Sequence, residues 1–209
     1  MAYELEEGGG PVIRARLAER LGHSAPTVTE MVRRLVAEGY LEVDNRALRL
    51  TGQGRQRAEA VVRRHRLAER LLADVIGLEW PKVHQEAGRW EHVISEDVER
   101  RLVVVLGDPA TCPHGNPIPG SGRPRRHLRQ LYAAQPGEEV RLARITETVE
   151  VDQDTLVYLD GHGFRPGTRA NVRERAPDGT LTLAVGETTL AVSPALADQL
   201  YVEDLATVP

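Results

Sequence analysis

Three histidines in the middle of the chain lie beside carboxylates at spacings that suit a metal ion. His65 and Glu69 are four residues apart, which places both side chains on one face of a helix. A second set also shares one helical face: His84, Gly88, Glu91 and His92. If the two faces meet, three imidazoles and two carboxylates can bind a divalent transition metal. The competing interpretation is that each pair is an ordinary solvated ion pair.

Motifs that would indicate an enzyme are missing from the sequence. It contains no HExxH or GxSxG motif and no glycine-rich phosphate-binding loop after a strand. Cys112 and His114 stand two apart in TCPHGNPIPG, but no third group that would orient a thiol and its base is evident. We therefore expect this segment to be a rigid connection, and we do not expect an enzyme.

Positive charge is concentrated in the N-terminal third. The 209 residues carry a net charge of -4, yet residues 12–70 contain 13 arginines against 7 acids. Lys82 is the only lysine, so nearly all positive charge is guanidinium, whose planar fork suits phosphate oxygens and guanine edges. This local excess of positive charge predicts a discrete DNA-binding module. The alternative is that the many arginines reflect only the overall composition of the protein.

The elements within this basic region predict a winged helix-turn-helix. Residues 11–21 place apolar residues at helical spacing, and residues 24–39 do so again after a short break, with Ser24 as the N-cap. Two short alternating segments around a polar turn follow over 40–51. The exposed face of the second helix carries groups able to reach bases and phosphates: Ser24, Thr27, Glu30, Arg33 and Arg34.

Residues 52–107 are helical in pattern. The first helix bears an apolar stripe from Ala58 to Ile76 that is too wide for a surface helix with one neighbour. We therefore expect this helix to supply the core of a dimer. Pro81 begins a second helix in this region, and Ser95 caps a third.

The C-terminal third changes to strand-like alternation. Prolines and glycines crowd residues 107–138, and apolar and polar residues then alternate over 140–145, 169–175, 181–185 and 189–192. A helix over about 153–159 and a turn near 194–200 interrupt the strands. The predicted fold is mainly α with a small β domain: winged helix over 1–51, helical dimerisation and metal domain over 52–110, linker over 111–138 and small β-barrel over 139–209.

Composition excludes several classes of protein. No stretch approaches the about 18 to 20 apolar residues of a membrane helix, and the N-terminus lacks the pattern of a secretory signal. We therefore expect a cytoplasmic protein without a membrane partner. The single cysteine, Cys112, excludes an intramolecular disulfide and a cysteine-rich zinc site.

Three segments of the chain resemble the diphtheria toxin repressor (DtxR/MntR) family of iron- and manganese-dependent transcriptional regulators. They are HRLAERLLADVIGL at 65–78, VHQEAGRWEHVISEDVERRL at 83–102 and GNPIPG at 115–120. The resemblance covers about residues 3–120, and 139–203 more loosely resemble the SH3-like (FeoA-like) third domain of that family. It implies a homodimer whose winged helices bind a palindromic double-stranded DNA operator when metal is bound.

The resemblance also assigns roles to individual residues. It places His65, Glu69 and His84 at an ancillary metal site, and Glu91 and His92 at the primary site that activates DNA binding. On the winged helix it implies that Ser24, Pro26 and Thr27 approach bases, and that Arg34 and Arg46 lie near phosphates.

Several positions depart from the family pattern. Gly88 stands where the iron-responsive members have Cys and the manganese-responsive members Glu, so it offers only its backbone carbonyl. The family's first helix contributes a further primary-site ligand from residues that precede Met1 here, so we expect either a missing N-terminal segment or an incomplete primary site. Glu30 replaces a Gln of the recognition helix. Asp152 lies near the position of an acidic ligand, although a surface aspartate is the simpler interpretation.

Imidazole and carboxylate ligands accept Mn(II) and Fe(II), and also bind Zn(II), Co(II), Ni(II) or Cd(II). No thiolate stands at the matched positions, and ligand type excludes little among these metals. We expect Mn(II), with Fe(II) as the alternative. Two other functions stay open. The chain can be a winged-helix regulator not controlled by metal, or a metal-handling protein or enzyme with a DNA-binding-like domain.

Overall fold

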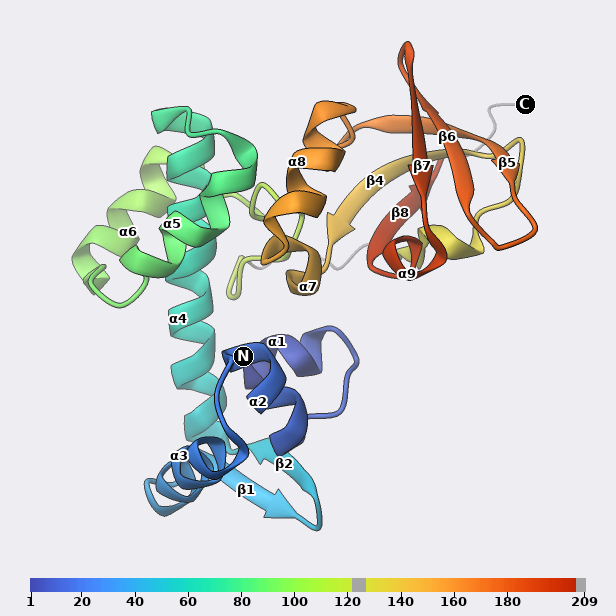
Figure 1. The fold of residues 1–209 in the computed structure, drawn as a ribbon. Helices are drawn as coiled ribbons and strands as arrows, with labels where there is room; N and C mark the ends of the chain where they lie inside the picture. Colours follow the sequence, from blue (N-terminus) through green and yellow to red (C-terminus); the bar gives the residue numbers. More distant parts are fainter. Residues whose placement is uncertain (122–126, 206–209) are drawn as a thin grey trace. The chain divides into compact units, whose positions relative to one another are not determined.

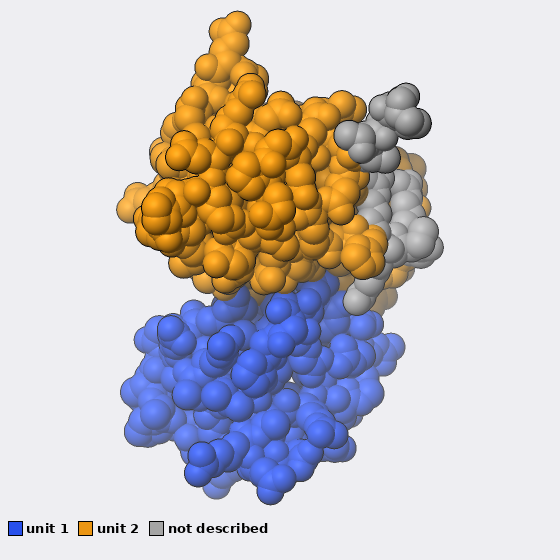
Figure 2. Space-filling model, turned by 90° about the vertical axis from the view of Figure 1, so that its right-hand side faces the viewer, with its two compact units in different colours: residues 1–62 blue, residues 63–209 orange. Residues whose placement is uncertain are grey.

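The structure is a computed structural model that describes residues 1–121 and 127–205. It forms two compact units, residues 1–62 and residues 63–209, which Figure 2 shows in two colours. The boundary falls inside helix α4 (Gly52–Arg70). Residues 122–126 of the expected linker and residues 206–209 of the expected β domain lie outside the described residues. Within the described ranges, none of the helices is long and apolar enough to cross a membrane.

The first unit has the winged helix-turn-helix order that the sequence predicts. Its elements are α1 (Ala2–Glu7), α2 (Arg14–Leu21), α3 (Ala25–Ala37), β1 (Leu41–Asp44) and β2 (Ala47–Leu50). The strands β1 and β2 pair in antiparallel register, and Ile13 adds a bridge to Ala47. One apolar cluster holds the helices and the hairpin together: Leu5, Val12, Leu17, Val28, Val32 and Leu48.

Helix α3 begins where the sequence places its cap. The Ser24 hydroxyl accepts a hydrogen bond from the Thr27 backbone N–H at 3.3 Å, and Pro26 occupies the first turn. Gly22, at the end of α2, adopts the left-handed conformation that reverses the chain between the two helices.

The helical part of the second unit surrounds the C-terminal half of α4 (Figure 1). After α4 come a π-helical turn (Leu71–Ile76), a 3-10 turn (Trp80–Lys82), α5 (Val83–Trp90) and α6 (Glu96–Val105). Pro81 therefore lies in the short turn before α5. The apolar stripe of α4 packs partly inside the chain, because Leu67 and Leu72 are buried against α5 and α6. Val75 and Ile76 at its end stay 59% and 55% exposed.

The C-terminal part of this unit is an antiparallel sheet of six strands in the order β3-β8-β4-β5-β6-β7. The strands are β3 (Arg129–Gln130), β4 (Glu139–Ile145), β5 (Arg169–Arg175), β6 (Leu181–Val185), β7 (Thr188–Val192) and β8 (Leu200–Asp204). Bulges in β4 and β5 bend the sheet, which closes on a core around Phe164. The expected small β domain is confirmed.

Two strands lie where the sequence predicts a turn or a linker. Residues 194–200, expected as a turn, form the short helix α9 (Pro194–Ala197) and enter β8, which pairs with β4 in the middle of the sheet. Strand β3 comes from the expected linker and pairs with β8. The alternation of Leu200, Tyr201 and Val202 was a signal for β8, whereas β3 is too short to show a period.

Helices α7 (Glu147–Glu150) and α8 (Gln153–Gly161) lie between the helical part and the sheet (Figure 1). The loop of residues 110–121 also joins the two. The Ile145 backbone N–H donates to the carbonyl of His114 at 3.0 Å. Gly115 packs so closely on β4 that a Cβ there would overlap the backbone oxygen of Ala143. Trp80 is buried in the sheet's core and donates to the carbonyl of Pro113 at 3.3 Å.

We predict that Gly115→Ala destabilises the protein strongly. Gly115 has a φ of 87°, and an L-residue in this left-handed conformation costs about 1–2 kcal/mol. The overlap of the new Cβ with the backbone costs about 1–3 kcal/mol more. Gly163→Ala is the matched control, because its φ is 66° and a Cβ meets no atom of the described chain within 4 Å. Thermal unfolding followed by circular dichroism should show the larger loss for Gly115→Ala; equal losses would contradict the close packing.

Candidate metal centre

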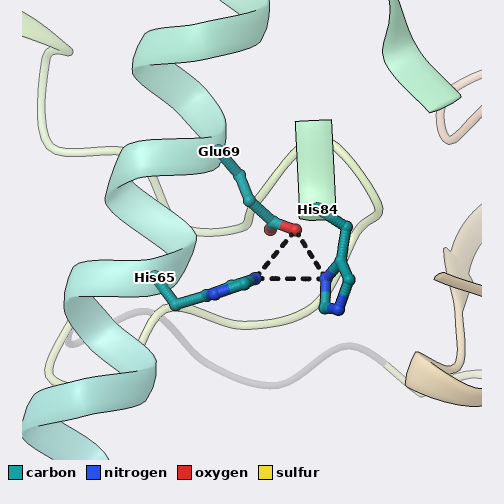
Figure 3. Close-up of side chains that lie close together, drawn as sticks. All are labelled: His65, Glu69 and His84. Carbon is teal, nitrogen blue, oxygen red and sulfur yellow. Dashed lines mark hydrogen bonds and ion pairs between the residues drawn. The ribbon is translucent and has the colours of Figure 1, made fainter. Parts of the chain in front are cut away.

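Helices α4 and α5 bring together three of the residues that the sequence singles out. His65 and Glu69 lie one turn apart on α4, and His84 stands in the first turn of α5. Figure 3 shows the three side chains pointing toward one another. The Glu69 Oε1 atom lies 3.2 Å from His65 Nε2 and 3.2 Å from His84 Nδ1, and the two nitrogens lie 3.1 Å apart.

These separations fit a divalent metal ion. With metal–ligand distances of about 2.1 Å, neighbouring ligand atoms lie about 3.0 Å apart around an octahedral ion and about 3.4 Å apart around a tetrahedral one. The observed values of 3.1–3.2 Å fall between these limits. One imidazole nitrogen from each histidine and one carboxylate oxygen can therefore bind an ion on a common face.

The Glu69 carboxylate is fully buried. Burial by itself raises the pKa of this carboxyl, but the charges and hydrogen bonds of the His114 and His65 rings hold the pKa well below its usual value. Its Oε2 atom is buried and has no hydrogen-bond partner among the described residues. A buried carboxylate with one oxygen unsatisfied is a ready ligand for a cation.

The two histidines carry the positive charge that a metal would otherwise supply. Burial lowers the pKa of His65, but Glu69 and a hydrogen bond to Glu91 raise it to a net value of about 9. Burial opposes protonation of His84 as well, and hydrogen bonds to Glu150 and Glu69 raise its pKa to about 11. Exchanging two imidazolium protons for one divalent ion leaves the charge of the cluster unchanged.

A second group of possible ligands shares Glu69. Cys112 and His114 are both fully buried, and with Glu69 they form three donors whose ligand atoms lie within 4.8 Å of one another. His114 Nδ1 lies 3.1 Å from Glu69 Oε1, while its Nε2 has no partner within the described part of the chain. Burial, together with the Glu69 and Glu150 charges, raises the pKa of the Cys112 thiol.

The sequence predicted only a rigid connection here and counted no sulfur among the donors. The loop instead folds back onto α4, so Cys112 reaches a residue 43 positions away in the sequence. The one signal for this arrangement was the pairing of a thiol and an imidazole two residues apart. That pair becomes informative only once the loop is known to pack on α4.

Glu150 is a further residue that the sequence did not identify. It ends α7, is 7% exposed, and places Oε2 3.0 Å from His84 Nδ1. The Asn116 side chain donates to Glu150 and to the carbonyl of Ile145. Asp152, the possible ligand from this region, instead caps α8 by accepting hydrogen bonds from the backbone and side chain of Thr155.

The remaining predicted ligands lie at the edge of this cluster. Glu91 Oε2 is 2.7 Å from His65 Nδ1, so Glu91 contacts the far side of the same ring. The His92 side chain is 71% exposed and lies 3.2 Å from the other Glu91 oxygen. Gly88 lies on α5, where a Cβ would meet no described atom within 4 Å. A primary metal site at Glu91 and His92 stays a prediction.

The residues expected to contact DNA lie on the surface of the first unit. The structure places Ser24 and Thr27 at the start of α3, where their hydroxyls lie 2.8 Å apart, with Pro26 between them. Arg34 lies near the end of α3, 3.7 Å from Glu38, and Arg46 is exposed in the turn between β1 and β2. Their contacts with DNA stay predictions.

Three family models match the chain. The "Iron dependent repressor, N-terminal DNA binding domain" matches residues 1–47, and the "Iron dependent repressor, metal binding and dimerisation domain" matches residues 51–120. The FeoA domain matches residues 129–204.

Similar proteins extend over nearly the whole chain. The iron-dependent repressor IdeR of Mycobacterium tuberculosis (strain ATCC 25618 / H37Rv) is 45% identical over 96% of this chain and 93% of its own length. The diphtheria toxin repressor of Corynebacterium diphtheriae is 42% identical over 97% and 93%. A solved structure of a manganese-dependent transcriptional repressor in complex with manganese covers 93% of this chain and 92% of its own, with a TM-score of 0.83 and 35% identity.

The fold and the matches together define a class of protein, the metal-dependent DNA-binding transcriptional repressors. The family consists of transcriptional repressors and not of enzymes. Within that class, this chain belongs to the diphtheria toxin repressor (DtxR/MntR) family.

We predict that metal binding releases protons and strengthens as the pH rises. Below a pKa of about 9 for His65 and about 11 for His84, each ring must lose a proton before it can bind a metal. With two imidazolium protons displaced, the apparent affinity should rise by about 100-fold per pH unit between pH 6 and 8, and a displaced thiol proton would add a further factor of about 10. Calorimetric titrations in buffers of different ionisation enthalpy count the protons.

His162 provides a control, because its ring bonds to the Tyr158 carbonyl outside the cluster and His162→Ala should leave the proton count unchanged. Cys112→Ser should lower the count by one if the thiol gives up its proton to become a ligand. A count near zero in the unaltered protein would contradict the assignment of His65 and His84.

Proposed function

We propose that this chain represses transcription by binding a palindromic operator as a homodimer when a divalent metal occupies the centre around Glu69. The observation that carries the proposal is the buried Glu69 carboxylate, on which three imidazoles converge at 3.1–3.2 Å. Its helix, α4, begins in the first unit, which carries the winged helix. The matched DNA-binding and metal-binding models support the same function.

We propose Fe(II) as the activating metal, with Mn(II) as the alternative. The sequence led us to expect Mn(II), although the nitrogen and oxygen ligands that it offered accept both metals. The buried sulfur of Cys112 favours Fe(II) over Mn(II), because thiolate ligands prefer metals softer than manganese. Zn(II), Co(II), Ni(II) and Cd(II) should bind the same donors in vitro, and relatives of this chain have been solved with Cd2+ and with Zn2+.

Exposed apolar residues support a second copy of this chain as the dimer partner. The region that matches the dimerisation model keeps large hydrophobic side chains more than half exposed: Val75, Ile76, Val93, Val104 and Val105. Covering them with the same surface of a second protomer would remove them from water. Such a dimer presents two winged helices, and each can bind one half-site of a palindromic operator.

Metal would control repression through an allosteric coupling. His65, Glu69 and His84 would hold the ion between α4 and α5, which would restrict α4, and α4 begins in the DNA-binding unit. A coupling free energy of about 1–3 kcal/mol changes operator affinity by about 5- to 150-fold. In this proposal, Ser24, Pro26 and Thr27 approach bases, while Arg34 and Arg46 bind phosphates.

The first test is recovery of genomic DNA fragments on the purified protein under anaerobic conditions with Fe(II), Mn(II) or chelator. We expect palindromic fragments to be retained only with metal. In Glu69→Gln, which keeps the shape of the side chain but removes the charged ligand, we expect this metal-dependent retention to be lost. Glu96→Gln is the matched control, because Glu96 is an exposed carboxylate on α6.

Equal retention with metal and with chelator would leave a winged-helix regulator not controlled by metal. Metal binding without DNA retention would instead indicate a metal-handling protein. Retention with Mn(II) but not Fe(II) would overturn the assignment of iron while leaving the repressor intact.

We predict that Arg34→Ala weakens operator binding at every metal concentration. A phosphate contact releases counterions, so its loss should lower the slope of log affinity against log salt by about 1 for each protomer and about 2 for the dimer. Arg100→Ala removes an equally exposed arginine from α6 and should change neither quantity. Fluorescence anisotropy across a salt series measures both, and an unchanged slope in Arg34→Ala would count against a phosphate contact.

A further inference from the structure

Three arginines of α4 hold the loop of residues 110–121 by its backbone carbonyls. Arg63 donates to the carbonyl of Pro119, and Arg66 donates to that of Pro117. Arg70 donates through Nε to the Thr111 carbonyl at 2.6 Å and through Nη2 to the Cys112 carbonyl at 3.1 Å. The loop is thus attached along the C-terminal part of the helix that carries Glu69.

The guanidinium of Arg70 reaches two consecutive carbonyls. These belong to Thr111 and Cys112, so the fork fixes the orientation of the peptide that precedes the thiol. On its other side, Arg70 pairs with Asp74 at 3.2 Å, which limits the rotation of the guanidinium. Arg70 is also the residue next to Glu69.

The rest of the loop has attachments that do not depend on Arg70. The Cys112 backbone N–H donates to the Asn116 carbonyl at 2.8 Å, and the Ile145 N–H donates to the His114 carbonyl. Arg66 continues to hold Pro117. Loss of the Arg70 fork should therefore free the Thr111 carbonyl and one of the two bonds to the Cys112 carbonyl, because the Gly115 N–H also donates to that carbonyl at 2.9 Å. The peptide before the thiol can then rotate, while the Cys112 N–H stays on Asn116 and His114 stays in place.

We propose that Arg70 is a positioning residue of the metal centre, which places the Cys112 thiol beside Glu69 and so decides whether the bound ion takes a sulfur ligand. The inference rests on the proposed function, since it requires a metal at Glu69. It adds a specificity-determining role for a side chain that does not itself bind the ion. A lysine keeps the charge but lacks the planar fork, so it cannot hold both carbonyls in the same way.

Co(II) is a suitable probe, because a thiolate bound to Co(II) gives a charge-transfer absorption in the near ultraviolet that nitrogen and oxygen ligands do not. We expect the unaltered protein to show this band at saturating Co(II), and Cys112→Ser to lack it. Arg70→Gln and Arg70→Lys should bind as many equivalents of Co(II) as the unaltered protein, with the band reduced at least fivefold. Merely weaker folding would not remove this band selectively.

Arg64→Gln is the matched control. Arg64 lies on the same helix and pairs with Glu99, and no bond from it to a loop carbonyl is found among the described residues. It should keep the band at full intensity. Thermal unfolding of the metal-free variants checks that each is folded, and Arg70→Lys serves if Arg70→Gln does not fold.

The outcomes separate this proposal from the proposed function. A full band in both Arg70 variants would overturn the positioning role of Arg70. Co(II) binding without a band in the unaltered protein would show that Cys112 is not a ligand, which overturns the inference but leaves a metal-dependent repressor. Failure of the unaltered protein to bind Co(II) at all would overturn both.

Discussion

The buried negative charge of Glu69 is the constraint around which the second unit is arranged. A carboxylate without solvent costs several kcal/mol unless partners compensate it, and here His65, His84 and His114 all approach the same oxygen. These partners come from α4, α5 and the loop of residues 110–121. The chain therefore cannot bury Glu69 without assembling the three segments. The same requirement explains the fit to a cation, because protons on the histidines and a divalent metal are alternative sources of the same positive charge.

Local sequence signals predicted the parts of this arrangement that depend on neighbouring residues. The spacing of His65 and Glu69 places both on one face of α4 whatever surrounds the helix, and the caps Ser24 and Ser95 act within one turn of their own helices. Strand alternation likewise identified β4 to β7. By contrast, Cys112, His114 and Glu150 join the cluster through contacts with residues far away in the sequence, and no period or cap encodes those contacts.

Glu150 and Asp152 show how a local interaction decides which of two neighbouring acids reaches the cluster. Asp152 starts α8, where its carboxylate accepts from the Thr155 N–H, a bond that an aspartate at an N-cap favours strongly. Glu150 ends α7 and has no such cap to form, so its longer side chain extends to His84 and Asn116. The family resemblance pointed to Asp152, with a surface aspartate as the simpler interpretation, whereas the structure places Glu150 beside His84 and leaves Asp152 at a helix end.

The arginines of α4 illustrate why charge counting overestimated the basic character of the DNA-binding region. Arg63, Arg66 and Arg70 fall within the arginine-rich span of residues 12–70, yet all three donate to loop carbonyls in the second unit. A guanidinium is well suited to this task because it offers several donors in one plane and stays charged when partly buried. Through these bonds the loop presents its thiol and imidazole to Glu69 on one side and binds β4 through the His114 carbonyl on the other. An ion that drew the His114 imidazole closer to Glu69 would therefore also act on β4, because ring and carbonyl belong to the same residue.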